Sequence, residues 1–189
     1  MSRAGFSLPE LLVALALGLV LSIAAVAMAA TALRHVAGFA LRAEADDLAY
    51  LALETFTLDV RRAGYDPRAI GVQPLAAASS SRLTIQADLD GDGTIDAASE
   101  EITTIACDVP GGRLSRIVGS QSLPLASGVV ACTVAYADDG GAAIAVPPAG
   151  LDPAARRRTR RASLDLALVP PGATAAARSR ATVALRVRP

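Results

Sequence analysis

A long apolar block near the N-terminus constrains this chain more than any other feature. It runs from Leu11 to Leu33, is broken only by one glycine and two hydroxyl residues, and ends at Arg34. At 1.5 Å per residue, its roughly 23 residues span about 35 Å as a helix, enough to cross the apolar core of a bilayer. The block therefore predicts a single membrane-spanning helix. Arg3, the basic residue that precedes it, places the N-terminal end in the cytoplasm and the remainder of the chain across the membrane.

Two ordinary explanations exist for such a block. It could be a cleaved signal peptide, with Ala27-Met28-Ala29 as the cleavage site, although it is longer than the usual apolar region of such peptides. It could also be a plain signal-anchor on an unrelated domain. Neither explanation accounts for Glu10, because a carboxylate beside an apolar helix is costly and is by default a functional residue.

The residues around Glu10 resemble the type IV prepilin cleavage and methylation motif. The segment Gly5-Phe6-Ser7-Leu8-Pro9-Glu10 carries that family's Gly, Phe, Ser or Thr, Leu, variable residue and Glu, and about twenty apolar residues follow. The resemblance implies cleavage by prepilin peptidase between Gly5 and Phe6, and N-methylation of Phe6. It also implies that Glu10 neutralises the Phe6 amine of a neighbouring subunit during assembly.

The helical pattern continues beyond the apolar block. Steps of three and four residues predict one apolar face packed under a domain, made of Leu41, Ala45, Leu48, Leu51, Thr55 and Leu58. Asp59 violates this pattern. Gly64 suits the position just after a helix, and Pro67 prevents continuation. The sequence therefore predicts a leader at 1–5, one helix with a transmembrane and filament-core part at 6–34 and an amphipathic part at 35–64, and a globular domain at 65–189.

Segments rich in β-branched residues and bounded by turn residues follow the predicted helix. They predict strands at Arg82–Ala87, Glu101–Cys107, Leu114–Val118, Val129–Ala137, Ser163–Leu168 and Thr182–Val187. The last two alternate apolar and polar residues, as half-buried antiparallel strands do. A helix followed by a run of strands indicates an α+β fold. The resemblance implies the pilin fold, in which a long N-terminal helix packs on a C-terminal antiparallel sheet.

Three internal segments resemble PilW-type minor pilins: Val60–Tyr65, Asp88–Asp96 and Gly112–Arg116. Pseudopilin J of type II secretion is the close relative. This resemblance implies a minor subunit of a type IV pilus or of a related secretion or competence filament. It implies an inner-membrane protein with a periplasmic domain that later enters the filament. Its partners would be other pilins or pseudopilins, prepilin peptidase and the inner-membrane assembly platform.

An acidic loop follows the first predicted strand. Its spacing resembles the start of an EF-hand calcium loop, with Asp88, Asp90, Asp92, Thr94 and Asp96 at positions 1, 3, 5, 7 and 9. The twelfth position is Ser99 instead of Glu, and Glu100 and Glu101 come directly after it. Two interpretations stay open: a loop that binds Ca²⁺ as the chain's one cofactor, or a solvated turn rich in Asp and Gly.

The two cysteines, Cys107 and Cys132, both fall in predicted strands. In the periplasm a disulfide between them would persist, and it would contribute roughly 3 kcal/mol in the chain-entropy model. The alternative is a pair of buried free thiols. Because no CxxC motif or Cys/His cluster occurs, a structural zinc site is not expected.

One dense charge run, Arg156–Arg161, holds five arginines and one threonine. Such runs can bind phosphate, and some competence pilins bind DNA. No aromatic residue accompanies the run to stack on bases. We therefore expect a solvated or subunit-contact surface, and no nucleic-acid partner.

Catalysis finds little support in the sequence. The single histidine, His35, lies at the expected membrane boundary, which excludes a Ser/His/Asp or Cys/His arrangement in the domain. Two hypotheses remain. The chain is a filament subunit without enzymatic activity, or it is a membrane-anchored or secreted binding domain outside the cytoplasm that depends on calcium.

Overall fold

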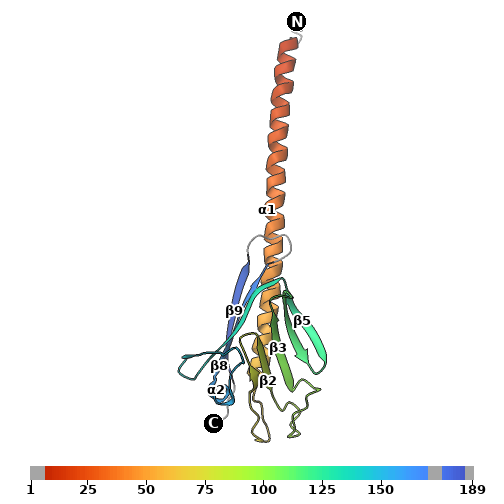
Figure 1. Ribbon diagram of the computed structural model, residues 1–189. Helices are drawn as coiled ribbons and strands as arrows, with labels where there is room; N and C mark the ends of the chain where they lie inside the picture. The colour runs from red at the N-terminus through yellow and green to blue at the C-terminus, as the bar shows by residue number, and fades with distance from the viewer. Residues whose placement is uncertain (1–6, 170–175, 186–189) are drawn as a thin grey trace. The chain divides into compact units, whose positions relative to one another are not determined.

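The computed structural model describes residues 7–169 and 176–185. The described residues contain one long helix, α1 (Leu8–Arg62), one short helix and nine strands (Figure 1). The chain divides into two compact units, Met1–Leu41 and Arg42–Pro189, and α1 belongs to both. The predicted α+β fold, with a long N-terminal helix followed by antiparallel sheets, is confirmed.

The part of α1 in the first unit presents apolar side chains on all sides. Its large apolar residues from Leu8 to Phe39 are each 56–75% exposed. The hydroxyl groups of Ser22 and Thr31 donate to the carbonyl oxygens of Gly18 and Ala27, at 2.8 and 2.9 Å. These polar groups are therefore satisfied within the helix itself. Among the described residues, α1 is the one helix that is long and apolar enough to cross a membrane.

The part of α1 in the second unit turns a different face to the sheets than the sequence predicts. Leu51 and Leu58 are 57% and 59% exposed, so their predicted place in the core is wrong. The buried face consists of Ala45, Ala49, Ala52, Phe56, Asp59 and Val60. Its three alanines complement the large side chains that the sheets supply to the same core cluster, and Phe56 and Val60 add larger side chains from the helix. The spacing of the leucines predicted a different face of the helix.

The C-terminal end of α1 follows its sequence signals. Gly64 lies two residues beyond Arg62 and has a φ of 75°, in the left-handed region that favours glycine. Its N–H donates to the carbonyl oxygen of Gln86 at 2.8 Å, and the N–H of Asp88 donates to that of Tyr65 at 2.8 Å. These bonds fix the chain reversal onto the sheet and bring the loop after Gln86 under the helix end.

The first sheet has five antiparallel strands in sequence order, β1-β2-β3-β4-β5. They are β1 (Leu75–Ala78), β2 (Arg82–Gln86), β3 (Ile102–Asp108), β4 (Arg113–Val118) and β5 (Gln121–Ser127). Alternate residues of β2 point into the core, so Leu83 and Ile85 are buried while Arg82 is exposed. The loop between β2 and β3 is the acidic segment, and its ends are held by this sheet.

The second sheet has four antiparallel strands in the order β7-β6-β8-β9. They are β6 (Val129–Ala137), β7 (Ala143–Ile144), β8 (Arg161–Leu168) and β9 (Ala177–Ala184), and α2 (Pro153–Arg158) lies between β7 and β8 in the chain. Four residues of β8 at alternate positions, from Ala162 to Leu168, are buried. This sheet therefore shares the hydrophobic core of the first sheet and α1.

Covalent and polar links join the two sheets. The predicted disulfide is present: Cys107 of β3 is bonded to Cys132 of β6. The hydroxyl of Tyr136 donates to the carbonyl oxygen of Ser79 at 2.8 Å, and burial raises its pKa. The N–H groups of Cys107 and Val134 donate to the β1–β2 turn, each at 2.8 Å. The turn is thus clamped between β3 and β6, which fixes one sheet against the other.

Several strands and one helix of the structure were not predicted from the sequence. The strands β1, β5 and β7 and the helix α2 were not expected, and β9 begins at Ala177 instead of Thr182. The predicted C-terminal end of that last strand, Val187, lies outside the described residues. The missed elements are short or alanine-rich, or contain proline, so they carry little periodicity of their own.

Candidate functional site

The N-terminal end of α1 holds Glu10 in a fixed place. The Ser7 side chain donates to Glu10 Oε2 at 3.1 Å, and the Ser7 N–H donates to the same oxygen at 3.4 Å. The N–H of Leu11 donates to the Ser7 carbonyl, which makes Ser7 the N-cap and Glu10 the third helical residue. This is the Ser-x-x-Glu spacing of a capping box, and Pro9 costs little in the first turn. Gly5 and Phe6, the residues of the predicted cleavage, lie outside the described residues.

Glu10 is exposed in the single chain. Its carboxylate lies at the positive end of the helix dipole, which stabilises an acid there. Of the two Glu10 carboxylate oxygens, only Oε2 accepts hydrogen bonds from residues 7–169 and 176–185. Oε1 can therefore accept a donor from another molecule. The local fold thus presents an oriented acid at the start of an apolar helix, and no ion pair joins it to another described residue.

The acidic loop between β2 and β3 is organised by two buried carboxylates. Asp88 is fully buried, and its two oxygens accept the N–H groups of Gly91 and Gly93 at 2.8 and 3.1 Å. Glu101 is 4% exposed and accepts three more backbone N–H groups, from Leu89 and Asp90 through one oxygen and from Asp96 through the other. The loop therefore wraps around these carboxylates.

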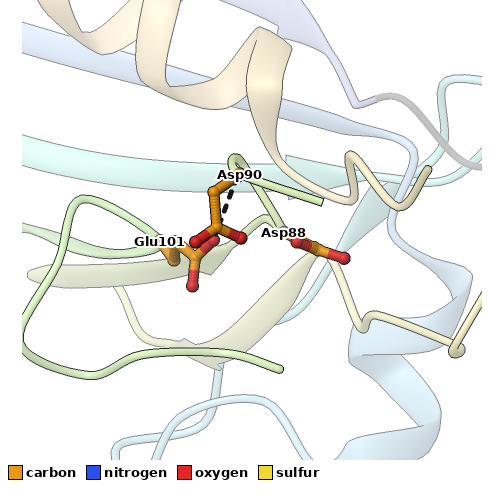
Figure 2. Close-up of side chains that lie close together, drawn as sticks. All are labelled: Asp88, Asp90 and Glu101. Carbon is orange, nitrogen blue, oxygen red and sulfur yellow. Dashed lines mark hydrogen bonds between the residues drawn. The ribbon is translucent and has the colours of Figure 1, made fainter. Parts of the chain in front are cut away.

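Glu101 is the loop residue that the EF-hand spacing does not include. Asp88, Asp90 and Glu101 each offer one carboxylate oxygen, and these atoms lie within 4.8 Å of one another. Figure 2 shows the carboxyl groups of Asp90 and Glu101 beside each other, with Asp88 close by. The N–H of Asp96 and further backbone donors hold the pKa of the Glu101 carboxyl below its ordinary value. That carboxyl is therefore ionised at neutral pH.

The other predicted ligands bond locally. Asp92 accepts both the N–H and the hydroxyl of Thr94, each at 2.7 Å, and these bonds lower the pKa of Asp92. Asp96 accepts the N–H of Ala98 at 2.8 Å. The structure therefore brings Asp88 and Asp90 together with Glu101, in a cluster that does not include Asp92, Thr94 or Asp96. Calcium binding stays a prediction.

Calcium would raise the melting temperature of the full chain in non-ionic detergent. At a hundred times its dissociation constant, an ion that binds only the folded state adds about 2.7 kcal/mol, or roughly 5–10 °C for a unit of this size. Asp90→Asn keeps an acceptor for the Asp92 N–H and is expected to reduce the shift, whereas Asp139→Asn, at an exposed site outside the loop, is not. A melting temperature that is the same in calcium and in chelator would contradict the prediction.

An ion-pair network around the buried Asp59 lies at the C-terminal end of α1. Asp59, 4% exposed, accepts Arg116 Nε at 2.8 Å and Arg116 Nη2 at 3.3 Å, and Arg62 Nη2 lies 2.8 Å from Asp59 Oδ1. Arg62 also donates to Glu100 Oε2 at 2.9 Å and to Thr103 Oγ1 at 2.9 Å. The Asp59 bond raises the pKa of Arg116, and the bond from Arg62 together with the Arg116 charge lowers that of Glu100. The network explains why Asp59 violates the apolar pattern: it joins the helix to β4.

Comparison with known proteins bears on the N-terminal segment. Residues 1–31 match the family model described as the prokaryotic N-terminal methylation motif. This match supports a type IV pilin-like precursor. It includes Glu10 and most of the apolar block, and with the exposed apolar part of α1 it fits a protein anchored in a membrane by one span. A pilin-type motif indicates a structural subunit that assembles with other pilins and is processed by prepilin peptidase. No curated protein matches the chain.

Proposed function

We propose that this chain is a minor pilin or pseudopilin of the PilW or pseudopilin J type. It would be assembled into, or prime or cap, a type IV pilus or a related secretion or competence filament. The methylation motif over residues 1–31, with Glu10 at the start of an apolar helix, is the observation that carries the proposal. The long helix followed by antiparallel sheets supports it, as do the three internal segments that resemble minor pilins.

In this proposal, prepilin peptidase removes residues 1–5 at the cytoplasmic face, and the new amine of Phe6 is methylated. Glu10 then becomes the acid that neutralises the Phe6 amine of a neighbouring subunit. Opposite charges in a low-dielectric helix bundle attract strongly, and neither can be left unpaired there cheaply. Oε1 of Glu10 accepts no hydrogen bond from the described residues, which supports this role, because it can accept the amine while Oε2 keeps the cap of α1.

Assembly would move α1 from the bilayer into a bundle of helices. The apolar first part of α1 suits both surroundings, since it exposes no charged side chain between Leu11 and Leu33. The second part of α1 supports the same role, because Tyr50, Leu51 and Leu58 are exposed on the side away from the core. The inner-membrane assembly platform and other pilins are the partners that such a transfer requires.

A second function, a membrane-anchored binding domain that depends on calcium, is favoured by one observation, the convergence of Asp88, Asp90 and Glu101. The two functions predict different mature proteins. Under the filament proposal, the leader at 1–5 is lost and the rest of the apolar block is kept. As a secreted domain, the chain would begin near Ala30, and as an uncleaved anchored domain it would begin at Met1.

The test is mass spectrometry of the mature N-terminus from the native host. We expect an N-terminal peptide that begins at Phe6 and carries one methyl group on its amine. The matched control is the same host without its prepilin peptidase, in which the chain should keep residues 1–5. A start near Ala30, or an intact leader in the host that has the peptidase, would contradict the proposal.

A further inference from the structure

The arginine run lies in the short helix α2 and in the residues that follow it. Arg156, Arg157 and Arg158 are in α2, which Asp152 caps by accepting the N–H of Ala155 at 2.7 Å. Arg160 and Arg161 follow at the start of β8. Arg157, Arg158 and Arg161 are exposed, and Arg156 and Arg160 are partly buried. The run is therefore held by secondary structure and is not a loose loop.

A hollow of about 340 Å³ lies beside this run. Its lining residues are Gln73, Leu75, Ala76, Gln86, Pro153, Arg156 and Arg157, so it has two guanidinium groups, two amides and no acid. Its volume is at the low end for binding sites, which suits side chains of a partner better than a cofactor. By contrast, the hollow that Arg158 lines also has Asp138 and Asp152 in its wall.

The arginines of the run lack acidic partners within the described part of the chain. Ion pairs there involve Arg62, Arg116 and Arg180, and none involves residues 156–161. Among the described residues, the Arg160 side chain donates only to the carbonyl oxygens of Arg157 and Thr159. The Nε of Arg156 is buried and has no hydrogen-bond partner among these residues. That buried atom is out of reach of another molecule, whereas the exposed guanidinium groups of Arg157 and Arg158 can pair with carboxylates from one.

We propose that this surface, defined by Arg156, Arg157, Arg158 and the adjoining hollow, binds an acidic segment of a partner protein through its carboxylates. Guanidinium groups pair with carboxylates through two parallel hydrogen bonds, and the glutamine amides can donate to the same oxygens. Protein is favoured over single-stranded nucleic acid because neither the run nor the hollow contains an aromatic side chain on which bases could stack. The proposal does not depend on the chain being a filament subunit.

Binding of a labelled hexaglutamate peptide to the full chain in non-ionic detergent tests the proposal by fluorescence anisotropy. We expect the wild type to bind this peptide, and not hexaglutamine, and we expect the double variant R157Q/R158Q to weaken binding about tenfold. This variant leaves the partly buried Arg156 in place, and a circular dichroism melt checks that it is folded. The matched control R113Q/R178Q removes two exposed arginines elsewhere in the same unit and is expected to bind as the wild type does.

Three results would overturn the proposal. The first is a wild-type chain that does not bind hexaglutamate. The second is an equal loss of affinity in R157Q/R158Q and R113Q/R178Q, which would indicate net charge and no site. The third is tighter binding of an oligothymidylate of matched charge than of hexaglutamate, which would assign the surface to nucleic acid. Each result is independent of where the mature N-terminus begins, so failure here is distinguishable from failure of the proposed filament function.

Discussion

Replacing Asp59 with alanine is expected to lower the free energy of unfolding of the second unit by about 3–5 kcal/mol. Asp59 is buried and accepts hydrogen bonds from Arg116, while Arg62 pairs with it from the same helix. Its removal leaves the Arg116 guanidinium, whose side chain is only 12% exposed, opposite Glu100 alone. A buried charge that loses its partner is far more costly than the pair itself is favourable, which is why the expected effect is large.

Chemical denaturation of the full chain in non-ionic detergent, followed by circular dichroism, measures this effect. Asp59→Asn keeps the size of the side chain and one acceptor oxygen. Its free energy of unfolding should therefore fall between that of the wild type and that of Asp59→Ala. The matched control is Asp165→Ala, because Asp165 pairs with Arg180 at the surface, where the two side chains are 41% and 68% exposed. Exposed pairs contribute at most about 1 kcal/mol. An equal loss of unfolding free energy in Asp59→Ala and Asp165→Ala would mean that the network around Asp59 stabilises the fold no more than an exposed ion pair does.

Glu10→Gln is expected to reduce incorporation of the chain into filaments by at least about a hundredfold. Loss of one partner of a buried pair costs about 3–5 kcal/mol, and each 1.4 kcal/mol is a factor of ten. Cleavage between Gly5 and Phe6 should continue, because before cleavage the Phe6 nitrogen is in a peptide bond and has no charge for Glu10 to neutralise. The variant should therefore accumulate in the membrane as processed, unassembled protein.

The measurement is an immunoblot of sheared filaments and of membranes from the native host in which the variant replaces the wild-type chain. Glu54→Gln is the matched control, since Glu54 is an exposed acid of the same helix in the second unit. It is expected to assemble as the wild type does. Wild-type incorporation of Glu10→Gln would remove the physical basis of the proposed assembly role.

Local sequence signals predicted the elements that carry strong periodicity. The apolar block located the first part of α1, and Gly64 located its end. Segments rich in β-branched residues and bounded by turn residues located β2, β3, β4, β6 and β8 within two residues at each end. These features depend on neighbours in the chain, which is why one sequence was enough to find them.

Features that depend on distant residues were not predictable. Asp59 looked like an error in the helix pattern because its partner, Arg116, is 57 residues away and lies in another element. Glu101 falls outside the EF-hand spacing, yet folding of the loop brings it to Asp88 and Asp90. The leucines of α1 suggested a core that the alanines in fact form, because the large side chains on the sheets determine which helix face fits.

The alanine face of α1 has a consequence for how this chain can vary. Ala45, Ala49 and Ala52 are almost fully buried, so a larger side chain at any of them would overpack the core. Leu51 and Leu58, on the opposite side, meet no such restriction from their own domain. One face of the helix must therefore keep small residues during evolution. The opposite face can change its residues together with those of a molecule that contacts it.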